Sequence, residues 1–201
     1  MARYLMLDVD GVLVTGRPSD GRPWFSELQS DLGIDIEWLR SDFFRIFWPE
    51  IVVGRRDLLP ALQSCLDQAS INTPAQLLVD YWFAMDSRVD DDILSHCAKL
   101  RTAGVSVYLA TNQDHLRAKY LMNEMKLADH VDGIFYSAEL GVSKPNLAFF
   151  QSVAEFLDAE PKEIFLVDDT LKNVIAARQA GWEAHHWLGT QPFAAGIEGR
   201  F

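Results

Sequence analysis

The sequence predicts an α/β protein whose core is a doubly wound parallel sheet, with a small helical cap inserted after the first strand. Three features predict this architecture. Short apolar runs alternate with helix-length patterns from residue 89 onward. These runs are continuous rather than alternating, as in parallel strands that are covered on both faces. Between the first apolar run and residue 89, the recognisable patterns are all helical.

The predicted strands are short, and each leads directly to a polar residue. The apolar runs lie at residues 4–7, 105–110, 134–136 and 164–167, followed by Asp8, Thr111, Ser137 and Asp168. Residues 183–187 are a candidate fifth strand. Helices are predicted at 93–103, 114–125, 146–157 and 170–180, with Gly104 and Gly181 as stop signals and Pro145 before the third.

The segment after the first strand is predicted as a helical insert on two hinges. Its helical patterns cover residues 24–32, 37–48, 57–69 and 74–85, between turn-forming and polar stretches. We therefore expect residues 1–14 and 89–196 to form the core, and residues 15–88 to form the insert. Ile197–Arg200 spells the recognition site of a clotting protease that removes fusion tags, so residues 197–201 are expected to be a tag remnant or a frayed tail.

Composition and charge argue against several classes of protein. Of the 201 residues, 49% are apolar, which disfavours disorder. A net charge of −11 argues against a nucleic-acid surface, and no apolar run approaches the roughly 18 residues of a membrane span. Cys65 and Cys97 cannot form a disulfide framework and are expected to be buried thiols. We expect a cytoplasmic monomer or homodimer without nucleic-acid or membrane partners.

The strongest chemical signal is Asp8-Val9-Asp10-Gly11, directly after the first predicted strand. Side chains at i and i+2 of an extended chain lie on the same side, so both carboxylates can face one cleft. Glycine then permits a tight turn. A calcium loop or a plain turn is the alternative, but a calcium loop needs further oxygen ligands, and the apolar residues 12–14 follow here.

Three further motifs also lie at or after predicted strand ends. They are Thr111-Asn112, Lys144-Pro145 before a helix, and Asp168-Asp169. Each has an ordinary structural alternative: turn residues, a solvated lysine, or a helix N-cap pair. Adjacent carboxylates repel one another unless a cation or a proton intervenes. Because the carboxyl ends of parallel strands share one edge where ligands bind, the four motifs together indicate a single site.

The chain resembles the haloacid dehalogenase-like hydrolases in these motifs. The resemblance rests on Asp8–Leu13, Thr111-Asn112, Lys144-Pro145 and Val167–Asp169, in the family's order. The insert looks like the family's first-type cap, as in sugar-phosphate phosphatases, phosphoglycolate phosphatases and β-phosphoglucomutases. Lys144–Asn146 and Val167–Asn173 look especially like glucose-1-phosphatase-type members.

The resemblance implies a Mg²⁺-dependent phosphatase of a small phosphorylated metabolite, such as a sugar phosphate or phosphoglycolate. Asp8 would be the nucleophile that forms an aspartyl phosphate. Asp10 would be the general acid and base. Thr111 and the amide of Asn112 would hold phosphoryl oxygens, and Lys144 would neutralise charge. The metal ligands would be Asp8, Asp10 through its carbonyl, Asp168 and Asp169.

Several other functions remain as alternatives. Dehalogenases of the family attack carbon without a metal, but they lack the second aspartate of the first motif, which is Asp10 here. Response-regulator receivers use similar groups, but in another order and without a cap. A phosphomutase that returns the phosphoryl group to a sugar, and a binding or assembly module without catalysis, both stay open.

Candidate substrate contacts in the insert are Arg45, Trp48, Arg55 and Arg56. Arginine suits phosphate and tryptophan suits a sugar face, although solvated arginines and a tryptophan packed in the core of the insert are the stronger interpretation. The nearby aromatic residues Phe43, Phe44, Phe47, Trp82 and Phe83 are expected to pack the insert. His185-His186 has no third ligand at metal spacing and is expected to be structural.

Overall fold

The computed structural model describes residues 1–201 and contains one five-stranded parallel sheet. The strands are β1 (Tyr4–Leu7), β2 (Ser106–Thr111), β3 (Gly133–Tyr136), β4 (Ile164–Asp168) and β5 (Glu183–His186), in the spatial order β3-β2-β1-β4-β5. The predicted parallel α/β fold is therefore confirmed, including its fifth strand. β1 lies at the centre, where Leu7 is in register with Leu109 of β2 and Val167 of β4.

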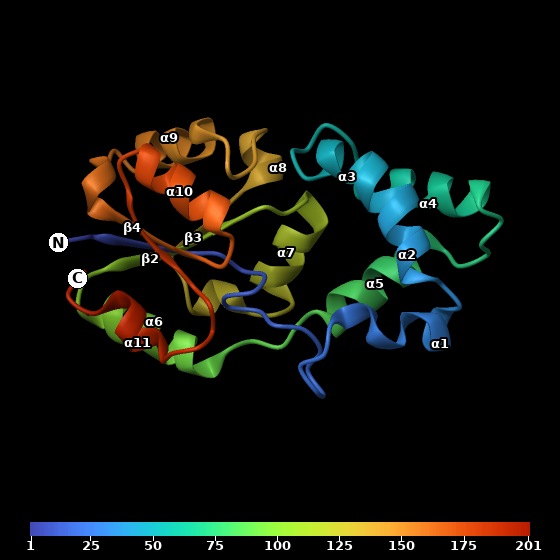
Figure 1. Ribbon diagram of the computed structural model, residues 1–201, viewed down its shortest axis with the longest axis horizontal. Coiled ribbons are helices and arrows are strands. Elements are labelled where there is room, and N and C mark those ends of the chain that lie inside the picture. Colours follow the sequence, from blue (N-terminus) through green and yellow to red (C-terminus); the bar gives the residue numbers. More distant parts are fainter.

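Helices cover both faces of the sheet (Figure 1). The helices of the first layer are α6 (Asp91–Thr102), α7 (His115–Asn123) and α11 (Phe193–Ile197), whose apolar residues join the buried cluster that contains Leu5 and Leu7. On the opposite face, α9 (Leu147–Phe156) and α10 (Leu171–Gln179) pack against Met6. Short helical turns complete this part: η3 (Leu127–Asp129), α8 (Ser137–Leu140) and η4 (Pro161–Glu163). Burial on both faces explains the continuous apolar strands.

The insert has its own buried cluster, which includes Leu28, Phe43 and Leu62. Its elements are η1 (Trp24–Glu27), α1 (Leu28–Leu32), α2 (Ile36–Trp38), η2 (Leu39–Phe44), α3 (Arg45–Ile51), α4 (Leu58–Gln68) and α5 (Ala75–Met85). In Figure 1 the insert lies to the right of the sheet, beyond α7, and two connecting segments of the chain join it to the rest of the protein. No helix of the structure is both long and apolar enough to cross a membrane.

One predicted helix of the insert differs from the structure. The pattern predicted residues 37–48, whereas the helical path runs from Ile36 through the π-helical turn η2 and on to Ile51, with Pro49 inside α3. In η2 the Arg45 N–H bonds to the carbonyl of Arg40, five residues back. In this wider turn a backbone N–H bonds to the carbonyl five residues back instead of four. The turn comes shortly before Pro49, whose ring and missing N–H disrupt a regular helix.

Contacts at three places join the insert to α7 and α8, which lie next to the sheet. The Ser137 hydroxyl donates a hydrogen bond to the carbonyl of Val52. Gly54 has a φ of +70°, and a β-carbon there would clash with the carbonyl of Ala138. The guanidinium of Arg117, on α7, is 1% exposed and donates to the carbonyls of Phe83 and Asp86 at the end of α5.

The two chain ends lie together on the side of the sheet away from the insert (Figure 1). The Ala2 N–H donates to the carbonyl of Arg200 at 2.8 Å. Arg200 also pairs with Glu183, and the ring of Phe201 lies 5.8 Å from that of Phe165. Residues 197–201 are expected to be a tag remnant or a frayed tail. In the structure Ile197 and Phe201 pack against the apolar core of the sheet, while residues 198–200 between them are exposed.

Candidate active site

The carboxyl ends of β1, β2 and β4 meet at the edge of the sheet that faces the insert (Figure 1). The Asp8 N–H donates to the carbonyl of Val167 at 2.9 Å, so the pairing of β1 with β4 extends one residue beyond the strand. Asp8 is 8% exposed, while Asp10 is exposed. Gly11 then turns with φ of +81°, and a β-carbon there would clash with the carboxylate of Asp169. Glycine is therefore needed where β1 approaches the end of β4.

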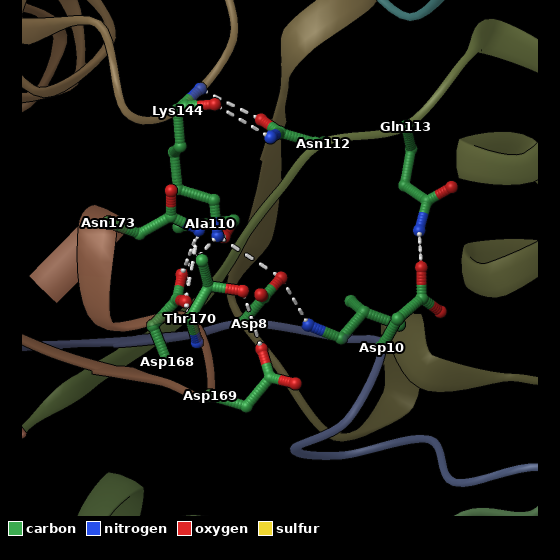
Figure 2. Close-up of polar contacts among 11 residues, drawn as sticks. Asp8, Asp10, Ala110, Asn112, Gln113, Lys144, Asp168, Asp169, Thr170 and Asn173 are labelled. Atoms are coloured by element: carbon green, nitrogen blue, oxygen red, sulfur yellow. Dashed lines mark hydrogen bonds and ion pairs between the residues drawn. The ribbon is translucent and has the colours of Figure 1, made fainter. Parts of the chain in front are cut away.

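Lys144 is the central cation of this edge. Its Nζ lies 3.1 Å from Asp8 Oδ1 and 2.6 Å from Asp168 Oδ2, and it donates to the carbonyl of Ala110 at 2.6 Å (Figure 2). The Asn112 side chain makes two hydrogen bonds to the backbone of Lys144. Its amide donates to the Lys144 carbonyl and its side-chain oxygen accepts from the Lys144 N–H, both at 2.9 Å. The peptide bond between Lys144 and Pro145 is cis. One buried ammonium thus links the ends of three strands.

Asp168 is completely buried and fully engaged. Besides Lys144, its carboxylate accepts hydrogen bonds from the Thr170 N–H at 2.8 Å and from the Asn173 amide at 3.0 and 3.1 Å. Asp169 is more open, and its Oδ1 accepts from the Thr170 hydroxyl at 3.1 Å. Its backbone carbonyl contacts Nε2 of His186 at 2.8 Å, which agrees with a structural role for this histidine.

The crowding of charges changes the proton affinities. Burial raises the pKa of Asp8 to about 7, with the charges of Asp168 and Asp10 adding to the effect and Lys144 opposing it. Burial lowers the pKa of Lys144, but Asp8 and Asp168 outweigh it, so the pKa is raised and the lysine stays charged. Burial also raises the pKa of Asp169. Anionic groups at this edge are therefore short of positive charge.

The residues at this edge fit a hard divalent cation. Asp8, Asp168 and Asp169 each offer a carboxylate oxygen, and the three oxygens lie within 4.8 Å of one another. Carboxylate oxygens are the ligands that Mg²⁺ prefers in proteins. The Asp10 carboxylate is not part of this group; it accepts a hydrogen bond from the Gln113 amide instead.

The structure therefore brings together the residues that the strand ends predicted. They are Asp8, Asp10, Asn112, Lys144, Asp168 and Asp169. Thr111 is 1% exposed at the end of β2, directly before Asn112 in the chain. Sequence reasoning missed Gln113 and Asn173, which bond to Asp10 and Asp168. Asn173 had a usable signal, since it lies in the first turn of the helix after Asp168-Asp169. For Gln113 there was none beyond its place after Thr111-Asn112.

The four candidate contacts in the insert are used differently. Arg45 donates to the carbonyl of Ser41, and Arg56 lies 4.9 Å over the ring of Phe47. Trp48 packs against both Phe44 and Trp82. Arg55 is exposed. The contacts of Arg45, Trp48 and Arg56 thus lie within the insert.

Comparisons with known proteins agree with this geometry. A family model described as haloacid dehalogenase-like hydrolase matches residues 3–181. The chain is 37% identical over 99 residues to the sesquiterpene phosphatase astK of Aspergillus oryzae, covering 49% of this chain and 50% of that protein. It is 29% identical over 84 residues to a phosphoglycolate phosphatase of Neisseria gonorrhoeae, covering 42% of this chain and 36% of that one. The matches thus span half or less of these curated relatives.

A solved structure with a similar fold is the HAD family enzyme bt-2542 from Bacteroides thetaiotaomicron, crystallised with magnesium and inorganic phosphate. The TM-score is 0.81 at 18% identity, and the match covers 97% of this chain and 98% of that chain. At this identity the likeness concerns the fold, which includes both the sheet and the insert.

Proposed function

The chain belongs to the haloacid dehalogenase-like hydrolase family, and we propose that it is a Mg²⁺-dependent phosphatase acting on a small phosphorylated metabolite. One observation carries the proposal. The buried Lys144 ammonium joins Asp8 of β1 to Asp168 of β4, with Asp169 close enough to share a cation with both. Such a cluster attracts and holds a phosphate ester only when further positive charge balances its carboxylates.

In the first half-reaction Asp8 acts as the nucleophile. One of its carboxylate oxygens bonds to phosphorus while the bond from phosphorus to the ester oxygen breaks, which gives an aspartyl phosphate and a free alcohol. Asp10 donates a proton to the departing oxygen. The Thr111 hydroxyl, the backbone N–H of Asn112 and the Lys144 ammonium hold the phosphoryl oxygens, whose charge is spread in the transition state.

In the second half-reaction the aspartyl phosphate is hydrolysed. Asp10 takes a proton from water, and the water oxygen bonds to phosphorus as the bond to Asp8 breaks. Asp8 is regenerated as a carboxylate, inorganic phosphate leaves, and no oxidant or further reactant is needed. Lys144 limits the repulsion between Asp8 and the bound phosphoryl group throughout.

Asp8, Asp168, Asp169 and the Asp10 backbone carbonyl would hold the Mg²⁺ ion. When bound, the ion would supply two positive charges that offset those of the carboxylates and the phosphate ester. Asp8, Asp10, Asp168 and Asp169 carry four negative charges, and Lys144 offsets one. With Mg²⁺ the excess falls to one negative charge.

We assign residues 15–88 as a cap over this site, with residues 1–14 and 89–196 as the catalytic core. The insert has a buried cluster of its own and faces the carboxyl ends of the strands. Closure of a cap excludes water and positions the substrate. Two buried free cysteines are compatible with a reducing compartment, so the proposal places the protein in the cytoplasm. It also includes a monomer or a homodimer as the oligomeric state.

One feature of the insert supports a second substrate class, apolar phosphate esters such as isoprenoid phosphates. The ring of Trp82 lies 5.5 Å from Trp24, 5.4 Å from Phe44 and 5.6 Å from Trp48, and all four side chains are half-buried. Trp82 is on the last turn of α5, near Asp86, whose pKa is raised in part by the charge of Asp10. The sesquiterpene phosphatase relative favours the same class.

A phosphate-release screen tests the proposal. Purified protein with Mg²⁺ is offered sugar phosphates, phosphoglycolate, farnesyl phosphate, nucleotides and an aryl phosphate, beside the Asp8→Asn variant. We expect release from at least one ester by the wild type and none by the variant. Equal release by both proteins would indicate a contaminant. Transfer of phosphate to a sugar would favour the phosphomutase, and no turnover at all would favour the binding module.

A further inference from the structure

The carboxylate of Asp10 is held by one side chain from a distant part of the sequence. The Gln113 amide donates to Asp10 Oδ2 at 2.6 Å, across 103 positions in the chain. Figure 2 shows the glutamine side chain reaching from the end of β2 toward the Asp10 carboxylate. Asp10 is exposed, and this is the one hydrogen bond that its side chain makes within the protein.

Gln113 itself is firmly anchored. It is 2% exposed, and its backbone carbonyl accepts a hydrogen bond from the Ala138 N–H at 3.2 Å and lies 3.3 Å from the Ser137 hydroxyl, whose proton is donated to Val52. The next residue, Asp114, caps α7 by accepting from the Leu116 N–H at 2.8 Å. The Gln113 amide is therefore held in place, whereas the Asp10 carboxylate is exposed and lies in the turn at Gly11. The position of Gln113 thus determines where the Asp10 carboxylate lies.

We propose that Gln113 is the positioning residue for Asp10, an inference that rests on the proposed function. The amide is neutral, so it fixes one carboxylate oxygen without adding charge to a crowded site. It leaves Oδ1 without a partner in the protein and available for proton transfer. Proton transfer by a general acid depends on geometry first, and small misplacements cost activity.

The leaving group of the substrate separates this role from a structural one. An alkoxide needs a proton as it departs, whereas p-nitrophenolate is stable without one. The Gln113→Met variant keeps the side-chain length but removes the donor. Its kcat/KM covers only the steps up to departure of the alcohol and so leaves out the later hydrolysis, in which Asp10 acts as a base. We expect kcat/KM to fall about 10- to 100-fold on an alkyl phosphate such as glycerol phosphate, a fraction of the 10²–10⁴ expected of general acid catalysis. On p-nitrophenyl phosphate the fall in kcat/KM should be at most about 3-fold, because p-nitrophenolate departs without a proton.

Two further variants sharpen the kinetic test. Asp10→Asn should show the same leaving-group preference in stronger form, and adding Gln113→Met to it should cost little more, because both changes remove one function. Gln151→Met, the same substitution at an exposed site on α9, is the matched control and should resemble the wild type. Equal losses on both esters, or additive losses in the double variant, would overturn the positioning role.

Crystal structures of Gln113→Met and Gln151→Met supply a test that needs no turnover. We expect the Asp10 carboxylate to occupy several rotamers in the first variant and its single rotamer in the second. An unchanged Asp10 rotamer in Gln113→Met would contradict the inference even if the enzyme is active. A wild type that releases phosphate from no ester would instead contradict the proposed function, and the rotamer comparison would still decide the role of Gln113.

Discussion

The ammonium of Lys144 lies 2.6 Å from Oδ2 of Asp168, and neither side chain has any exposed surface. Moving two charges out of water costs several kcal/mol, which their attraction offsets only when the remaining hydrogen-bonding positions are filled. Here they are filled: Lys144 also contacts Asp8 and the Ala110 carbonyl, while Asp168 accepts from Thr170 and Asn173. The pair is therefore part of a closed network that fixes three strand ends.

Removal of the cation should destabilise the protein strongly. In Lys144→Met the carboxylates of Asp8 and Asp168 stay buried without their partner, and we expect a loss of about 3–5 kcal/mol in the free energy of unfolding. Urea denaturation at pH 7 measures it. Lys172→Met, at an exposed position on α10, is the control and should change stability by less than about 0.5 kcal/mol. A loss in Lys144→Met as small as in the control would mean that the network is not cooperative.

The carboxylate of Asp169 should be needed for the divalent cation more than for the fold. It is the most open of the three clustered carboxylates. We expect Asp169→Asn to lower Mg²⁺ affinity at least about 10-fold, since removal of a ligand charge weakens binding of a hard cation. Titration calorimetry with MgCl₂ measures this without turnover, and EDTA should abolish phosphate release by the wild type. The control is Asp158→Asn, at an exposed position, which should bind Mg²⁺ as the wild type does. If Asp169→Asn binds Mg²⁺ with undiminished affinity, Asp169 is not a ligand of the metal.

Arg117 should hold the second hinge of the insert in place. Its guanidinium donates to two carbonyls at the end of α5 and lies 5.1 Å over Phe83 and 5.5 Å over Tyr120. We expect Arg117→Met to leave the carbonyls unpaired and to destabilise the protein by about 2–4 kcal/mol. Amide hydrogen exchange should rise first at residues 83–90. In Arg40→Met, which removes an exposed ion pair with Glu37, exchange in that segment should stay unchanged; the same pattern in both variants would argue against the hinge role.

Stability should fall as the pH rises through the titration of Asp86. Burial, together with the charge of Asp10, raises the pKa of Asp86 to about 6 from 3.8, while Arg117 opposes the shift. Below pH 4 the carboxyl is protonated in both the folded and the unfolded chain. Between pH 4 and 6 it ionises more readily in the unfolded chain, so its contribution to stability is lost across this window.

The Asp86→Asn variant removes that titration. Between pH 4 and pH 7 it should lose about 2 kcal/mol less stability than the wild type, measured as the difference in the free energy of unfolding. Asp80→Asn, at an exposed position on α5, supplies the comparison and should follow the wild type. Identical pH dependence in the wild type and Asp86→Asn would show that Asp86 keeps an ordinary pKa.

The sequence allowed the site to be predicted because its residues follow buried strands. Leu7, Ala110 and Val167 are buried on the sheet, and their apolar runs identify the strands without knowledge of the partners. Once the strands are parallel, Asp8, Thr111 and Asp168 must share an edge. The position of the site depends only on where the strands end, so an error of one residue at a strand start, such as β2 starting at Ser106 rather than 105, leaves it unchanged.

The interactions that hold the site together could not be predicted in this way. Asn112 bonds to the backbone of Lys144, and Arg117 bonds to backbone carbonyls of the insert. A backbone group is present at every residue, so a pattern of side chains does not reveal which one is the partner. Arg117 also lies on α7 beside charged, exposed Lys119, and nothing in its local sequence distinguishes a buried arginine from a solvated one.

Ser137 has one hydroxyl proton and two carbonyl groups within reach, Val52 in the insert and Gln113 at the end of β2. If the insert swings away and withdraws Val52, the hydroxyl can rotate toward Gln113 and remain hydrogen-bonded. Breaking the contact with Val52 therefore leaves no buried hydroxyl without a hydrogen-bond partner. Such an unpaired donor would cost about 1–3 kcal/mol. A contact made by such an exchangeable bond lets the insert and the core separate at Val52 and rejoin without a large energetic barrier at that point.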